Sequence, residues 1–282
     1  MKAICERQEL LQALSALSRV VPSRPSSPIL GGCLLFTGHE GIVLQGTDLD
    51  LSLTIRVPAE ISEDGSFVVP LRHFLDLVRR LPEGGVILEW NGRGSRLEVR
   101  YREGAAVRLD VWDAEEFPSL QPRALGNGIS IEGELWKNLT KKVVFSAAAR
   151  EIRPNYAGIY FEAKGEDLIL VSTDTYRLSV VRIPYTFEGN VEGGILVPTQ
   201  AVNESVRLVG DDEQLEVTWD KRVVSFQTER FVLTTRLIDA RFPAYESVIP
   251  GSSELDLYVD KDLLESCLER ASLFVEPNER FA

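Results

Sequence analysis

The sequence predicts an α+β fold made of tandem, similar domains, each with two helices packed on antiparallel sheets. Three observations support this prediction. The same order of helix, strands, helix and strands occurs twice within the 282 residues. The strand segments alternate apolar and polar residues and are separated by short turns rich in Gly, Asn and Asp, which favours antiparallel pairing. Each copy is also long enough to bury a core of its own.

An amphipathic helix is the first predicted element of each copy. It includes Leu10 in "LLQALSALSRVV" and Leu135 in "LWKNLTKKVVF", which is expected to be helical as far as Phe145. A loop with proline and basic residues follows, and then a glycine and a strand that ends in Phe36 or Phe161. The two copies therefore begin with the same local structure.

A Thr-Asp turn and a strand that stops at Val-Pro or Ile-Pro come next in both copies. The first reads "GTDLDLSLTIRVPA" and the second "STDTYRLSVVRIPY". Asp and Thr side chains at such places hydrogen-bond the local backbone, so we expect Asp48 and Asp174 to fix turns. The alternative is that these carboxylates serve acid/base or metal chemistry.

A second helix follows a Val-Pro pair in each copy. The segments "LRHFLDLVRRL" and "TQAVNESVRLV" are expected to be helical, with Pro70 and Pro198 in the first turn, where a missing N–H costs nothing. Alternating strands complete each copy, which ends in Phe117-Pro118 or Phe242-Pro243.

The copies predict the domain boundaries. We expect one domain at 1–122 and a second at 123–250, with the Pro- and Gly-containing segment 120–128 as linker. Leu263 and Leu264 align with Leu10 and Leu11, so 251–282 is expected to be the start of a third, truncated domain.

Composition limits the class of protein. With 44% hydrophobic and 26% charged residues, the chain is typical of soluble globular proteins. It has no apolar run long enough to span a membrane, and its charged N-terminus has no signal core. Cys5, Cys33 and Cys267 are widely spaced and are expected to be buried, unpaired thiols. We therefore expect a cytoplasmic protein.

The formal net charge of −12, taken alone, argues against binding to nucleic acid. The charge is unevenly distributed, however, because the predicted helices are locally basic and the acidic residues concentrate in strands and turns. The simpler interpretation is that the basic residues form solvated helix faces. The alternative is a basic surface within an acidic protein, which would bind phosphates without reading sequence. The basic residues are Arg7, Arg19, Arg24, Arg72, Arg79, Arg80, Lys137, Lys141, Lys142, Arg207 and Arg270.

Catalytic motifs are missing from the sequence. It has no GxxxxGK[ST], no GxGxxG after a strand, no HExxH and no GxSxG. His39 and His73 are the only histidines, and they fall in different predicted elements. We therefore expect no catalytic centre, no metal and no cofactor.

Several segments in this order resemble one family. The repeat, "SRPSSPIL", "GTDLDL", "STDTYRL" and "DARFPAYESVIP" are together similar to the bacterial DNA polymerase III beta subunit, the sliding clamp. The resemblance covers essentially the whole chain. It implies tandem clamp domains in a ring-forming architecture, and a processivity factor that is not an enzyme.

The resemblance also implies partners. These are double-stranded DNA, the replicative polymerase subunit, the clamp loader, other proteins with clamp-binding motifs, and a second copy of the chain in a homodimer when it is full length. No membrane partner is implied. Two alternatives remain open at this point: a repeat scaffold with no role on DNA, and a carboxylate-dependent hydrolase that uses Asp48 and Asp174.

The family's functional residues transfer to matching positions of this chain. The implied DNA-binding residues are Arg24, Arg72, Arg150 and Arg153. The implied peptide-binding residues are Arg153, Tyr156, Thr173, Thr175, Tyr176, Arg177, Leu178, Pro243 and Val248. Many family members have Gly and His where this chain has Thr175 and Tyr176.

Overall fold

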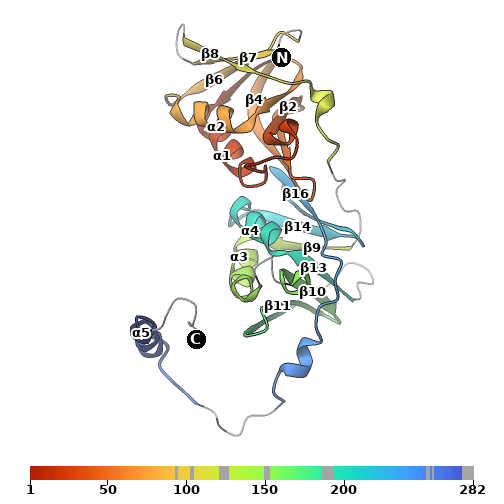
Figure 1. Cartoon of the computed structure of the whole chain (residues 1–282), viewed down its shortest axis with the longest axis vertical. Helices are drawn as coiled ribbons and strands as arrows, with labels where there is room; N and C mark the ends of the chain where they lie inside the picture. Colours follow the sequence, from red (N-terminus) through yellow and green to blue (C-terminus); the bar gives the residue numbers. More distant parts are fainter. Residues whose placement is uncertain are drawn as a thin grey trace. The chain divides into compact units, whose positions relative to one another are not determined.

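The computed structural model describes residues 1–92, 95–101, 105–120, 127–148, 153–185, 193–251, 255 and 257–274. The chain divides into two compact units, Met1–Phe242 and Pro243–Ala282. The first unit contains both copies of the repeat, coloured red to yellow and green to light blue in Figure 1. Within the described residues, no helix is long and apolar enough to cross a membrane.

The first copy contains two helices among antiparallel strands. Its elements are β1 (Lys2–Glu6), α1 (Arg7–Leu17), η1 (Pro28–Gly31), β2 (Gly32–Gly38), β3 (Gly41–Thr47), β4 (Leu51–Glu63), β5 (Ser66–Pro70), α2 (Leu71–Arg80), β6 (Gly85–Glu89), β7 (Arg96–Tyr101), β8 (Ala105–Asp110) and η2 (Ala114–Glu116).

The second copy repeats this order, which confirms the predicted repeat and the α+β class. Its elements are β9 (Asn127–Glu132), α3 (Gly133–Lys141), η3 (Val144–Ser146), η4 (Pro154–Tyr156), β10 (Gly158–Lys164), β11 (Asp167–Thr173), β12 (Leu178–Pro184), β13 (Gly193–Pro198), α4 (Thr199–Leu208), β14 (Gln214–Trp219), β15 (Val223–Gln227) and β16 (Phe231–Arg236). The second unit contains η5 (Tyr245–Val248) and α5 (Lys261–Ser272).

Strand β4 joins the two copies. It is 13 residues long and pairs with β3 along one edge. Its other edge pairs with β16 of the second copy, from Leu51 opposite Thr235 to Ile55 opposite Phe231, and then with β1. All pairings are antiparallel, and a single sheet with the order β8-β7-β6-β1-β4-β16-β15-β14-β9 therefore continues from one copy into the other.

The remaining sheet of the second copy is separate, with the order β12-β11-β10-β13. It corresponds to β4-β3-β2-β5 in the first copy, which have the same neighbours. The helices pack in pairs, with α1 against α2 and α3 against α4, as Figure 1 shows.

Helical periodicity explains which faces are buried. In α2, Leu71, Phe74, Leu75 and Val78 have the spacing that puts side chains on one face, and all four are buried. In α3, Trp136 is fully buried and its Nε1 donates to Ser205 Oγ of α4 at 3.0 Å. Burial of each such large side chain stabilises the fold by about 1.5–3 kcal/mol.

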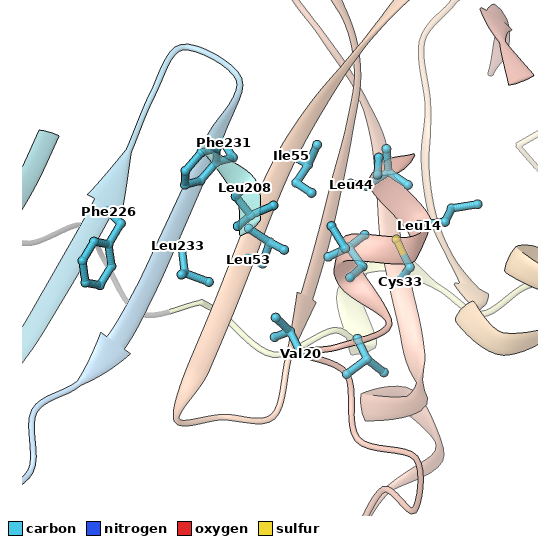
Figure 2. Packing of buried hydrophobic residues seen from close by; sticks show 14 of the residues in the cluster. Leu14, Val20, Cys33, Leu44, Leu53, Ile55, Leu208, Phe226, Phe231 and Leu233 are labelled. Atoms are coloured by element: carbon cyan, nitrogen blue, oxygen red, sulfur yellow. The ribbon is translucent and has the colours of Figure 1, made fainter. Parts of the chain in front are cut away.

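Apolar side chains also fill the junction between the copies. Leu53 and Ile55 of β4 lie beside Phe231 and Leu233 of β16, with Leu208 of α4 nearby (Figure 2). These residues belong to one continuous hydrophobic cluster that includes core residues of both copies. The copies therefore share a core as well as a sheet.

Several local expectations were wrong. Pro70 and Pro198 are the last residues of strands and the N-cap residues of α2 and α4, so they precede the first helical turn. Helix α3 ends at Lys141, and Phe145 lies in the 3-10 helix η3, where it is exposed. Each copy also begins with a strand, β1 or β9, that the pattern did not predict.

The cysteines differ in exposure. Cys5 and Cys33 are buried as expected, but Cys267 on α5 is exposed, so the prediction of three buried thiols was wrong. Burial, with a smaller contribution from the charge of Glu6, raises the pKa of Cys5 to about 12. Burial also raises the pKa of Cys33, so both thiols stay protonated and unreactive at neutral pH.

Candidate functional site

The Thr-Asp turn of the second copy connects β11 to β12. Thr173 Oγ1 accepts a hydrogen bond from the Thr175 N–H at 3.0 Å and donates to the Arg177 carbonyl at 2.7 Å. Asp174 Oδ1 accepts from the N–H groups of Tyr176 and Arg177, at 3.0 and 2.9 Å. The side chains of Thr173 and Asp174 thus hold the turn rigid.

The first copy has the same turn between β3 and β4. Thr47 Oγ1 accepts from the Leu49 N–H and donates to the Leu51 carbonyl, both at 2.9 Å. Asp48 Oδ1 accepts from the N–H groups of Asp50 and Leu51, at 3.0 and 2.7 Å. The prediction that Asp48 and Asp174 fix turns is confirmed.

The second-copy turn has one interaction more. Arg177 Nε donates to Asp174 Oδ2 at 2.9 Å, whereas Leu51 occupies the matching place in the first copy. Partial burial acts to raise the pKa of Asp174, but hydrogen bonds from the Arg177 and Tyr176 backbone N–H groups and from the Arg177 guanidinium outweigh it. The pKa is therefore held below its usual range.

The rigid turn presents side chains to solvent. Tyr176 is 81% exposed, Arg177 is also exposed, and Leu178 at the start of β12 is half-buried. Thr175 is exposed and has φ 81°, a left-handed conformation that a β-branched residue rarely adopts. An aromatic ring, a guanidinium and an aliphatic side chain are thus offered on a fixed backbone.

Arg153 precedes η4 and Tyr156 ends it, in the same unit. The Arg153 guanidinium carbon is 5.9 Å from the centroid of the Tyr156 ring, which is a cation–π arrangement. The Tyr156 carbonyl accepts from the Ala148 N–H at 2.9 Å. Two residues before Ala148, Ser146 Oγ lies 2.7 Å from Ser179 Oγ, next to Leu178. Hydrogen bonds on the segment after α3 therefore link η4 to the start of β12.

The other predicted site residues are placed as follows. Pro243 and Val248 belong to the second unit, in which Pro243 precedes η5 and Val248 ends it with 68% of its surface exposed. Arg24 is exposed in the segment between α1 and η1, and Arg72 is exposed on α2. Arg150 lies outside the residues that the structure describes. The structure thus brings together Arg153, Tyr156 and the turn 173–178.

The basic side chains fall into two groups. In the first, Arg7 Nε donates to the Val78 carbonyl at 3.0 Å, Lys137 Nζ lies 2.6 Å from Asp211 Oδ1, and Arg79 pairs with Asp76. In the second, Arg24, Arg72, Lys141 and Lys142 have no ion pair with any carboxylate of the described ranges. This second group keeps its charge available to a phosphate.

Sequence reasoning missed an ion pair between the copies. Arg19, just after α1, donates through Nε to Glu204 Oε2 of α4 at 2.6 Å. Glu204 also pairs with Arg207, and its side chain is only 5% exposed. From the sequence, only the basic residue Arg207 of this helix was considered, and not the inward-facing Glu204. The sequence pattern of one copy also contains no signal for an ion-pair partner in the other copy.

Tandem α+β domains that share a sheet across their junction, with available cations and a rigid exposed turn, are the features of a clamp-type protein. The family described as "DNA polymerase III beta subunit, N-terminal domain" matches residues 1–121. The family described as "DNA polymerase III beta subunit, central domain" matches residues 130–244. The chain therefore belongs to the DNA polymerase III beta subunit family, the beta sliding clamps.

Relatives support this assignment. The chain is 32% identical to the beta sliding clamp of Escherichia coli (strain K12) over 100% of its own length and 76% of that protein's length. The crystal structure of the DNA polymerase sliding clamp from Bacillus subtilis superposes with a TM-score of 0.91 at 25% identity, covering 98% of this chain and 75% of that one.

A third relative shows the same fold at lower identity. The Helicobacter pylori beta clamp, whose structure has a bound DNA ligase peptide, gives a TM-score of 0.88 at 22% identity over 97% of this chain and 76% of that one. The matched family ranges and the Escherichia coli and Bacillus subtilis relatives establish that the chain is a sliding clamp, a processivity factor of DNA polymerase and not an enzyme. The hydrolase alternative is therefore wrong.

Proposed function

We propose that this clamp contacts duplex DNA through Arg24, Arg72, Arg150 and Arg153, without reading its sequence. The observation that supports this is the available charge of Arg24 and Arg72, in a chain whose other helix-associated arginines are largely engaged in internal pairs. Arginine contacts with phosphates position a protein on DNA but carry no sequence information. An acidic chain of net charge −12 then holds DNA weakly and relies on encirclement for retention.

Salt dependence tests the DNA contacts. We expect Arg24→Ala and Arg72→Ala each to lower the slope of log K against log salt for a labelled duplex by about 0.9, since each removes one phosphate contact. Arg96→Ala is the matched control, because Arg96 is an exposed arginine of β7 paired with Asp110 at 3.1 Å. A slope that changes as much in the control as in the two variants contradicts the assignment.

We propose further that partner proteins dock short peptides on Arg153, Tyr156, Thr173, Thr175, Tyr176, Arg177, Leu178, Pro243 and Val248. Support comes from the rigid turn that presents Tyr176 and Arg177 beside Leu178, and from the link to Arg153 and Tyr156. The Helicobacter pylori relative was crystallised with a DNA ligase peptide. Aromatic, aliphatic and arginine side chains are typical of energetically dominant docking residues.

Variants with selective effects distinguish the proposed peptide-binding residues from the proposed DNA-binding residues. Leu178→Ala and Pro243→Ala are expected to weaken binding of a clamp-binding peptide, such as one from a DNA ligase, while leaving the salt slope for DNA unchanged. Arg24→Ala is expected to do the reverse. Equal effects of either variant on both ligands would show that the residues are assigned wrongly.

We infer that copies of the complete chain join through open strand edges into a ring. Within one chain, β16 of the second repeat pairs with β4 of the first. The counterpart of β16 in the first repeat is β8, and the counterpart of β4 in the second repeat is β12. Among the described strands, β8 and β12 end their sheets. Strand pairing of the β16–β4 kind can therefore form again at these edges. Heterologous contacts of this kind close into a ring when the rotation between subunits allows it.

Sedimentation of the full-length chain tests the join. Val107→Asp places an inward charge on the edge strand β8 and is expected to dissociate a homodimer into monomers. Arg108→Ser, on the outward face of the same strand, is the control. A dimer that survives Val107→Asp with unchanged affinity argues against β8 as the interface.

The domain bounds and the location complete the proposal. Domains at 1–122 and 123–250, with 251–282 as the start of a third, are supported by the matched family ranges of 1–121 and 130–244. A role in replication supports a cytoplasmic location. Limited proteolysis tests the bounds, since cleavage is expected first near 120–128.

A further inference from the structure

A cavity lies at the junction of the two copies, beside the Thr-Asp turn of the first copy. Its volume is about 390 Å³, and it is lined by residues of the turn, the start of α4, the end of β16 and the segment that follows β16. It lies within the first compact unit. The volume is in the range of pockets that hold small ligands or a few side chains of a peptide.

Part of the lining of this cavity is apolar. Ala157, Pro198, Ala201, Leu237 and Ile238 line it, and none of these side chains carries a polar atom. Thr199, which also lines the cavity, already donates through Oγ1 to the Ala157 carbonyl at 2.9 Å. These residues can therefore pack against an aliphatic side chain of a ligand. The Thr199 hydroxyl proton needs no further acceptor there, because it is already donated to Ala157.

The lining also includes a carboxylate with an available oxygen. Asp48 lines the cavity, and its Oδ1 is used by the two turn N–H groups. Its Oδ2 has no partner among the residues that the structure describes. In the second copy the equivalent oxygen of Asp174 accepts from Arg177 Nε, but Leu51 replaces that arginine here.

The net charge of the cavity lining is negative. Asp48, Asp50 and Arg236 are its charged residues, and Asp50 pairs with Arg236 at 3.6 Å. The carboxylate of Asp48 is therefore left without a counter-charge in a lining that is apolar in part. A ligand that complements both features carries a guanidinium or ammonium group beside an aliphatic side chain.

We propose that this junction cavity is a second peptide-docking site, which takes a short segment with Arg or Lys next to an aliphatic residue. The ligand's cation binds Asp48 as Arg177 binds Asp174 in the second copy, and its aliphatic side chain packs on Ala201 and Ile238. The inference takes from the proposed function only the kind of ligand, a peptide. The two sites are expected to prefer peptides of opposite charge, because the second-copy turn presents Arg177 to its ligand and the first-copy turn presents Asp48.

Amide NMR of the labelled 282-residue chain tests the site. The probes are the capped tripeptide Leu-Arg-Leu and its uncharged match Leu-Gln-Leu. Leu-Arg-Leu is expected to shift the amides of Leu49, Asp50 and Ile238, and Leu-Gln-Leu to bind about tenfold more weakly, because it lacks the charge-assisted hydrogen bond. No shift at these amides at millimolar Leu-Arg-Leu overturns the proposal.

Two substitutions assign the binding to Asp48. Asp48→Asn keeps the acceptor for the turn N–H groups but removes the charge, so Leu-Arg-Leu is expected to bind about tenfold more weakly. Gln200→Glu adds a carboxylate at an exposed lining position and is expected to tighten binding. Equal affinity of all three proteins for Leu-Arg-Leu overturns the proposal.

The matched control is Asp174→Asn, which makes the same change in the equivalent turn. It is expected to leave Leu-Arg-Leu binding unchanged. A loss in Asp174→Asn with none in Asp48→Asn would place the tripeptide at the second-copy turn and overturn the proposal. The proposed function fails separately, if Leu178→Ala leaves binding of the DNA ligase peptide intact.

Discussion

Arg19 of the first copy reaches across the junction and donates through Nε to the buried carboxylate of Glu204 in the second copy, at 2.6 Å. Glu204 is held on its other oxygen by Arg207 of its own helix. In the first copy, Asp76 and Arg79 of α2 form a corresponding pair, but both are exposed. Of the two equivalent acidic residues, only Glu204 is therefore buried and paired across the junction between the copies.

Removal of Arg19 is expected to weaken this junction. Arg19→Ala leaves Glu204 buried with one cationic partner, so the free energy of unfolding should fall by about 1.5–3 kcal/mol in urea denaturation. Arg79→Ala removes the exposed counterpart and should cost less than about 1 kcal/mol. Similar losses in both variants would mean that burial of Glu204 adds nothing.

Glycine at position 175 is expected to stabilise the second-copy turn. Thr175 has φ 81°, and the left-handed conformation costs an L-residue about 1–2 kcal/mol that glycine avoids. Thr175→Gly should therefore raise the free energy of unfolding by about 1 kcal/mol, after the greater freedom of glycine in the unfolded chain is counted. Leu49→Gly, at the same φ in the first copy, is the companion test, and a loss of stability in both would refute this account.

The backbone hydrogen bonds to Asp174, together with its ion pair to Arg177, make part of the stability depend on pH. The pKa of Asp174 in the folded chain lies below its ordinary value of 3.8. Its contribution is therefore fully present above that value and is lost as the pH falls through the lower folded-state pKa. The difference in melting temperature between the wild type and Asp174→Asn should be largest near neutral pH and shrink in acid. A difference that grows on acidification would reverse the assigned sign.

Thiol reactivity should divide the three cysteines. Cys267 is exposed, whereas burial keeps Cys5 and Cys33 protonated and inaccessible. A thiol-reactive chromogenic disulfide should therefore label one cysteine rapidly in the native chain and three in urea. Cys267→Ser should remove the rapid phase, and a rapid phase that persists would show that Cys5 or Cys33 becomes accessible.

The repeat and the two turns were predictable because their signals are local. Thr-Asp followed by a strand needs only the residues from Thr173 to Pro184, and the helices show their buried faces in the spacing of apolar residues. The strands β1 and β9 were missed because five or six residues before a helix show too little alternation to stand out.

Contacts between the copies could not be predicted from either copy alone. The pairing of β16 with β4 and the ion pair of Arg19 with Glu204 join segments that are far apart in the chain. Nothing in the pattern of β4 indicates which strand lies along its second edge. The residues of the candidate site came from the family resemblance, and the structure added the hydrogen bonds that make the turn rigid.

Strand β4 has a consequence for the way the chain melts. Its 13 residues pair with β1, β3 and β16, so unfolding of β4 disrupts the sheet of the first copy and also removes the neighbour of β16 in the second. Residues 1–242 should therefore unfold in one cooperative transition, with the amides of β4 among the slowest to exchange with deuterated solvent. The two domains are therefore expected to fold and unfold together as a single cooperative unit.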